Sequence, residues 1–197
     1  MANTQAQFGF KPIDSGGAPS YRLATAPILS SYTTKIYFGD PVIYSTASQY
    51  IQPATGTGNV TSIIGIFQGC QFTPSTGGPP QWSPWWPGAA NADAVAYIVP
   101  NTDTQARFLV ASLLTSVQAT TIGRNIGFST GAGGTTAGGG YSTFVVDQAT
   151  ITTAPAVGAF RVYGLYATQG LGNGTDTTTS YNWVIVGFNA QSTAVIA

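Results

Sequence analysis

The feature that most constrains the fold of this chain is a succession of short runs rich in Val, Ile, Tyr, Phe and Thr, separated by Gly, Pro, Asn and Ser. β-Branched and aromatic residues favour strands, and the separating residues favour turns. Because the turn signals return about every dozen residues, the pattern predicts an all-β barrel or sandwich of about eight to nine short strands. The runs span residues 21–29, 35–38, 41–45, 60–68, 94–99, 106–111, 142–147, 159–167 and 181–189.

Two segments carry more detailed expectations. Residues 112–119, SLLTSVQA, alone have helix-like spacing of apolar residues, so at most one short helix is expected. Strand alternation within residues 159–167 predicts that one face carries Phe160 and Val162, and the other carries Arg161, Tyr163 and Leu165.

The N-terminal stretch, residues 1–20, has few apolar residues and several glycines and prolines. It is interpreted as an extended arm with Phe8 and Phe10 as contact points, followed by a single β-rich domain over residues 21–197. Because residues 1–13 offer little core, their deletion is expected to leave the domain folded. The glycine-rich residues 129–141 are predicted to form a mobile surface loop.

Charge is unusually scarce in this chain. Only 6% of residues are charged, against roughly 25% in typical soluble domains, and the six basic and six acidic side chains cancel. The six basic residues are scattered, which disfavours nucleic-acid binding. No run in the sequence approaches the roughly 20 apolar residues that a membrane span needs. A nearly uncharged surface favours a protein that is a permanent component of a large assembly. The start lacks the features of a signal peptide, so synthesis in the cytoplasm is expected.

The side chains that usually perform catalysis are also missing. The chain has no histidine and no glutamate, and its single cysteine, Cys70, lies in a strand-like apolar run. A catalytic triad of the usual kind lacks its histidine, and one cysteine with dispersed aspartates cannot supply the four ligands of a zinc site. Isolated aspartates such as Asp40 in FGDP are interpreted as turn residues. We expect no enzymatic activity, no catalytic or metal site and no cofactor; a hydrolase built on two distant aspartates is the remaining enzymatic alternative.

The stretch PPQWSPWWPG, residues 79–88, contains Trp82, Trp85 and Trp86 between four prolines. Rigid proline geometry and three large aromatic surfaces allow three interpretations. The stretch could bind a sugar or another ring-shaped ligand, clip a long loop onto its own domain, or anchor the chain in a neighbouring subunit. The sequence leaves these open, although packing is favoured over sugar binding because the polar neighbours are unspecific.

Five stretches in order carry a resemblance to a known family: MANTQAQFGFKPI, FGDPVIY, IIGIFQGCQF, WSPWWPGAANADAVAYIVPNTDTQARFLV and NWVIVGFN. Together they resemble the capsid decoration, or cement, proteins of tailed bacteriophages, over nearly the whole chain. The long glycine loop and the lack of acids near the C-terminus depart from that pattern. The residues that match the family's motifs in the arm and in the tryptophan loop are Phe8, Phe10, Pro12, Trp82, Trp86, Pro87 and Gly88.

The resemblance implies a structural virion protein that is made in the host cytoplasm and sits on the outer surface of the capsid. It would bridge neighbouring major capsid subunits and self-associate as a trimer or a dimer, with the matched residues contributing to folding or attachment. The alternative from the residues themselves is a carbohydrate- or host-surface-binding module of a phage tail or fibre, in which Trp85 would stack on a glycan.

Overall fold

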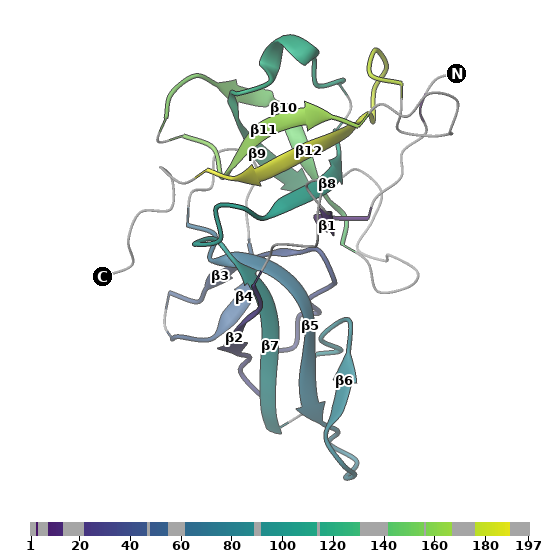
Figure 1. Cartoon of the computed structure of the whole chain (residues 1–197). Helices are drawn as coiled ribbons and strands as arrows, with labels where there is room; N and C mark the ends of the chain where they lie inside the picture. Colours follow the sequence, from purple (N-terminus) through teal and green to yellow (C-terminus); the bar gives the residue numbers. More distant parts are fainter. Residues whose placement is uncertain are drawn as a thin grey trace.

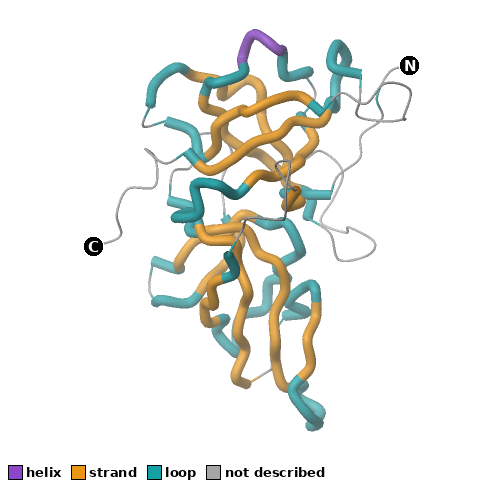
Figure 2. The backbone as a smooth tube through the Cα atoms, viewed as in Figure 1, coloured by secondary structure: helices purple, strands orange, loops and turns teal. Residues whose placement is uncertain are grey.

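Two antiparallel β-sheets account for nearly all the regular structure in the computed structural model of this chain (Figure 1). Strands fill both halves of the molecule, and within the described residues a single 3-10 turn is the only helical element (Figure 2). The predicted all-β class is confirmed. The structure describes residues 3, 8–13, 22–46, 48–54, 62–88, 92–113, 115–130, 142–155, 157–166 and 176–189, with the backbone alone at 92 and 93. Their elements are β1 (Lys11–Ile13), β2 (Ala24–Pro27), β3 (Pro41–Tyr44), β4 (Ile51–Pro53), β5 (Gly65–Thr73), β6 (Gln81–Ser83), β7 (Ala92–Pro100), β8 (Arg107–Ala111), η1 (Ala119–Thr121), β9 (Asn125–Thr130), β10 (Phe144–Thr152), β11 (Phe160–Leu165) and β12 (Trp183–Phe188).

The first sheet, sheet A, forms the upper half of Figure 1 with the strand order β1-β8-β12-β11-β9-β10. The last strand of this order, β10, also meets β8, the strand next to β1, because Ser112, directly after β8, forms a parallel bridge with Val146 of β10. The Leu113 N–H also donates to the Val146 carbonyl oxygen at 2.8 Å. Sheet A therefore closes into a small barrel, which leaves fewer free strand edges than an open sheet would.

Phenylalanines fill the interior of this barrel. Phe10 stacks on Phe160 with ring centroids 4.4 Å apart, and it meets Phe108 and Phe128 edge-on at 6.3 and 6.4 Å. All four side chains are fully buried. Such aromatic pairs add stabilisation beyond the area that they bury, so the cluster is the main packing unit of the barrel.

The interpretation that residues 1–13 offer little core is wrong for Phe10 and the residues beside it. The Phe10 N–H donates to the Gly39 carbonyl oxygen at 3.0 Å, and β1 pairs with β8 at the edge of sheet A. A side chain on Gly9, whose φ is +67°, would collide with Ser142. Burial of a single aromatic, and not the number of apolar residues, makes this segment part of the domain. Residues 14–20 lie outside the described residues, and the division at residue 20 stays a prediction.

The second sheet, sheet B, forms the lower half of Figure 1 with the order β2-β7-β5-β3-β4, and β6 pairs with the outer part of β5. Its own core contains Phe67, Cys70 and Trp86. The two halves share packing, because Ile66 of β5 and Val99 of β7 belong to the same buried cluster as the barrel phenylalanines. The barrel and sheet B are therefore joined through a continuous core.

The predicted helix over residues 112–119 is wrong for the residues that the structure describes there. Ser112 forms the bridge to β10, and the Val117 N–H and carbonyl oxygen both bond the side chain of buried Asn182, at 2.9 and 3.0 Å. These backbone groups are therefore not engaged in a helical ladder. The 3-10 turn η1 begins at Ala119, the last residue of this range. The predicted strand over 35–38 is also not a strand, although Ile36 forms a bridge with Trp86.

The glycine-rich segment begins within β9, which ends at Thr130. Residues 131–141 lie outside the described residues, so the mobile loop stays a prediction. The last two strands, β11 and β12, pair antiparallel, as expected for a hairpin.

Candidate functional site: the Trp82 face

The three tryptophans of PPQWSPWWPG have three different environments, and Trp86 is the buried one. Its side chain is fully buried, its Nε1–H donates to the Tyr32 carbonyl oxygen at 2.9 Å, and its ring meets Phe72 edge-on at 5.7 Å. Its backbone exchanges two hydrogen bonds with Ile36. Gly88 then passes so close to Thr33 that a Cβ would lie 2.7 Å from the Thr33 carbonyl oxygen. Trp86 and Gly88 thus clip this loop onto its own sheet.

Trp85 takes an intermediate position at the surface. Its side chain is 37% exposed, its N–H donates to Ser83 Oγ at 3.2 Å, and Pro87 beside it is exposed. The carbonyl oxygen of Trp85 accepts a weak bond from the Cys70 thiol at 3.4 Å. Burial raises the pKa of Cys70 to about 12, so the thiol stays protonated. Cys70 is thus a buried core residue, as predicted.

Trp82 is the most exposed large apolar side chain in the described part of the chain, at 61%. It lies on β6, and its ring rests against Gly69 of β5, where a Cβ would come 2.7 Å from Trp82 Cζ2. Gly69 has a φ of +139° next to a register shift between β5 and β7. A glycine is needed here both for that backbone conformation and for the contact with the indole. The ring is thus held in place while much of its surface stays open to solvent.

The strand register extends this exposed surface across four strands. Directly opposed residues in an antiparallel pair share a face. Trp82 opposes Gln71 of β5, Gln71 opposes Val95 of β7, and Val95 opposes Pro27 of β2. The neighbouring row on the same face holds Tyr97 and Thr25. We call this surface the Trp82 face, and it comprises Thr25, Pro27, Gln71, Trp82, Val95 and Tyr97.

The Trp82 face is uncharged, and half of its residues are apolar. None of its six residues is charged, and within it Tyr97 Oη donates to Gln71 Oε1 at 3.2 Å. Exposed Leu23 and Leu29, at 54% and 38%, continue the alternation at the two ends of β2. In Figure 1, β2, β7, β5 and β6 lie side by side at the end of the molecule away from the barrel. The face therefore offers an uncharged surface in which Trp82, Val95 and Pro27 lie beside polar side chains, two of them hydrogen-bonded to each other.

The sequence-predicted site residues do not form one surface. Phe10 is in the barrel core, Pro12 is on β1, and half-buried Phe8 meets Trp183 edge-on at 5.3 Å. Only Trp82 belongs to the face, with Trp85 and Pro87 exposed shortly after it. Sequence reasoning missed the other five residues of the face. The alternation of Leu23, Pro27 and Leu29 along one side of a strand is the sequence signal that could have indicated the part of the face on β2.

The four aspartates whose side chains the structure describes serve turns. Asp103, Asp147 and Asp176 each accept a hydrogen bond from the backbone N–H two residues later, at 3.1, 2.9 and 2.9 Å. Asp40 accepts the Tyr37 N–H at 2.7 Å, and burial raises its pKa to about 7. The turn role predicted for Asp40 is confirmed. In the described ranges no three of the His, Cys, Asp and Glu side chains gather as a metal site would need.

Comparison with known proteins adds no relative. No family model, curated protein or solved structure shows a significant match to this chain. Within the described residues, no helix has the length and apolar character to cross a membrane.

Proposed function

We propose that this chain is a structural virion protein, a capsid decoration protein that binds the outside of a tailed-bacteriophage head and bridges neighbouring major capsid subunits. The observation that carries the proposal is the Trp82 face, with a 61% exposed tryptophan on an uncharged sheet surface. The partner is the major capsid protein, and self-association as a trimer or a dimer on the lattice is part of the proposal.

Exposure of this surface favours a partner that covers it. Exposed apolar surface marks interaction sites, and tryptophan is enriched among the hot-spot residues of interfaces. Because the face has no charged residue, its affinity for a partner should depend little on ionic strength. On a repeating shell many such contacts act together, so each one needs only modest affinity.

The segments that resemble decoration proteins also pack against one another. Phe10 of the FGF segment bonds Gly39 of FGDPVIY, and the Gly39 N–H donates to the Phe67 carbonyl oxygen of IIGIFQGCQF at 2.8 Å. The same strand, β5, pairs with β6 of the tryptophan loop. Four of the five stretches thus build one structural unit, as a shared fold would require, and this supports the proposal.

Protein mass spectrometry of purified particles of the encoding phage tests this proposal. A capsid decoration protein is present at a large copy number related to the lattice, and heads that lack it release their genome at a lower temperature. A few copies per particle would place the chain in the tail and contradict the proposal.

A second candidate function, glycan binding by a phage tail or fibre, is favoured by one detail of the same face. The Trp82 ring lies beside the hydrogen-bonded Tyr97 and Gln71, and a sugar ring can stack on an indole while its hydroxyls bond such a pair. Binding of neutral glycans that is lost in Trp82→Ala, with head attachment unchanged, would favour this function over decoration.

A further inference from the structure

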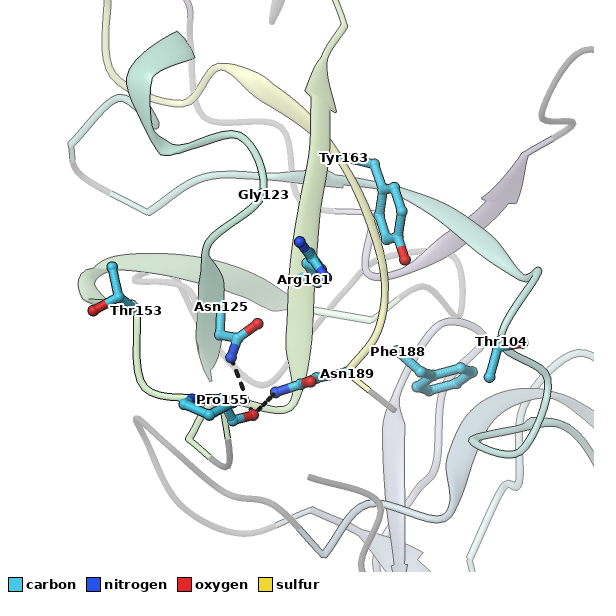
Figure 3. Close-up of a pocket in the computed structure, with 9 residues that line it drawn as sticks. All are labelled: Thr104, Gly123, Asn125, Thr153, Pro155, Arg161, Tyr163, Phe188 and Asn189. Atoms are coloured by element: carbon cyan, nitrogen blue, oxygen red, sulfur yellow. Dashed lines mark hydrogen bonds between the residues drawn. The ribbon is translucent and has the colours of Figure 1, made fainter. Parts of the chain in front are cut away.

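A second candidate site lies away from the Trp82 face, on the side of the barrel. A cavity of about 350 Å³ is bounded by β9, β11, the end of β12 and the loop between β7 and β8 (Figure 3). This volume is within the range of small-molecule sites. In Figure 1 the strands that bound it are in the upper half, whereas β6 is near the opposite end.

Two asparagines hold one wall of the cavity in place. Asn125 Nδ2 donates to the carbonyl oxygens of Ala154 and Pro155, at 2.9 and 3.2 Å. Asn189 Nδ2 donates to those of Pro155 and Gly158, both at 3.0 Å. Figure 3 shows both amides reaching the same Pro155 carbonyl. With its nitrogen committed to the turn, Asn125 keeps its Oδ1 as an acceptor, and in the described residues no donor reaches that oxygen.

Arg161 occupies the middle of the cavity in Figure 3. In the sheet it is directly opposite Asn125 on one side and Gly187 on the other, so the three positions share the outer face of the barrel. Gly187 contributes no side chain, and Arg107 and Tyr163 fill the space above it, since a Cβ there would lie 2.8 Å from Arg107 Nη1 and 2.9 Å from Tyr163 Cε2. Among the described residues, the Arg161 side chain makes no hydrogen bond and no ion pair.

The other arginine near this cavity is used differently. Arg107 Nη1 donates to the carbonyl oxygens of Thr104 and Ala106, both at 2.9 Å, and its guanidinium lies 3.6 Å above the Tyr163 ring. Arg107 therefore fixes Tyr163, which forms the opposite wall. One arginine supports the cavity and the other is available to a ligand.

These groups define the chemistry of a ligand. An uncommitted guanidinium matches a carboxylate, which it can bind through two parallel hydrogen bonds. Asn125 Oδ1 can accept a hydrogen bond from a ligand, and the Thr104, Thr153 and Tyr163 hydroxyls both donate and accept. A fully ionised phosphate has no donor for Asn125. A hydroxylated carboxylic acid provides both kinds of group.

We infer that this cavity binds an acidic sugar, with its carboxylate on Arg161 and its hydroxyls on Asn125 and the wall hydroxyls. The inference does not depend on capsid attachment, since the cavity and the Trp82 face share no residue. Two sources supply such a sugar: uronic acids within bacterial polysaccharides and sialic acids at the ends of glycans. On a virion, the site would give the particle weak contact with a glycan-covered surface.

Nuclear magnetic resonance titration of the full-length ¹⁵N-labelled chain tests the inference, with glucuronate, N-acetylneuraminate and neutral glucose as the probes. One of the acids should shift the side-chain amide signals of Asn125 and Asn189 saturably, and glucose should bind at least about tenfold more weakly, as expected when a charge-assisted bond is lost. Which acid binds identifies the source.

Arg161→Gln should weaken binding of that acid by about tenfold or more. Arg124→Gln is the matched control, because Arg124 is an exposed arginine that does not line the cavity, and its removal changes the net charge equally. Arg124→Gln and Trp82→Ala should both leave binding unchanged. No saturable shift with either acid, equal binding of glucose, or equal losses in the two arginine variants would overturn the inference.

Discussion

Replacing Trp82 by alanine removes the largest and most exposed side chain of the Trp82 face, at its β6 edge, and leaves the buried core unchanged. A tryptophan side chain can bury up to about 250 Å², and Trp82 is 61% exposed, so about 150 Å² is available to a partner. At about 25 cal/mol per Å² this surface contributes up to about 4 kcal/mol of binding free energy. The ordering of side chains reduces that figure, and the expected loss is about 2–4 kcal/mol per contact, or roughly thirty- to several-hundredfold in Kd.

The assay is binding of fluorescently labelled protein to purified heads that lack it. Trp82→Ala should bind far more weakly, while its free energy of unfolding should change by less than about 1 kcal/mol because most of the ring is already in solvent. Ile122→Ala is the control, since Ile122 is 48% exposed and lies beside η1, at the other end of the molecule in Figure 1. Equal affinity of Trp82→Ala and the wild type would refute the reasoning that assigns attachment to this face.

Three further predictions concern the core. Phe10→Ala should lower the free energy of unfolding by about 3–5 kcal/mol, because it empties the centre of the barrel; urea denaturation measures this, and an unchanged midpoint would mean that the N-terminal segment is dispensable. Burial raises the pKa of Asp40 to about 7 from its usual 3.8, so the folded state holds the proton more tightly than the unfolded state does. The free energy of unfolding should therefore fall by up to roughly 4 kcal/mol as the pH rises from about 4 to about 7, and then level off. Asp40→Asn should remove most of that slope, and a slope of the same size in the variant would assign it to other groups. Cys70 should react with a thiol reagent only as fast as the protein opens, because its thiol is buried and its pKa is about 12; rapid labelling of the native protein would contradict this.

The all-β class could be predicted because the β-branched and aromatic runs are frequent and the turn residues between them are regular. The short strands β1, β4, β6 and β9 were not predicted, because their sequences KPI, IQP, QWS and NIGFST contain prolines, glycine, asparagine and glutamine. These segments are strands because longer neighbours pair with them. Such pairing is a tertiary effect that local propensity does not contain.

Leu165 illustrates how one residue changes a face. Simple alternation placed Leu165 with Arg161 and Tyr163, away from Val162. The pairing of β11 with β12 shifts by one residue between Val162 and Gly164, so that Leu165 opposes Val184 and packs against the barrel core. A bulge adds one residue to one strand and inverts the alternation after it. Gly164, an isolated glycine inside a strand-like run, is the sequence signal that could have indicated a bulge here.

The Trp82 face was only half predictable for a similar reason. The tryptophan stretch was recognised as important, but the sequence gives no sign that Trp86 enters the core while Trp82 stays outside. The other residues of the face come from β2, β5 and β7, which are far apart along the chain, and only the register brings Pro27, Gln71 and Val95 into one row with Trp82. Register depends on pairing across the whole sheet, which periodicity within a strand does not determine.

The most direct test of attachment through the Trp82 face is a cryo-electron microscopy map of the intact phage particle, averaged over the symmetry of the head. The account predicts density for the barrel and sheet B on the outside of the shell, with the indole of Trp82 against a major capsid subunit and the barrel cavity facing outward. Density for this chain only in the tail, or on the head with the Trp82 face open to solvent, would contradict it.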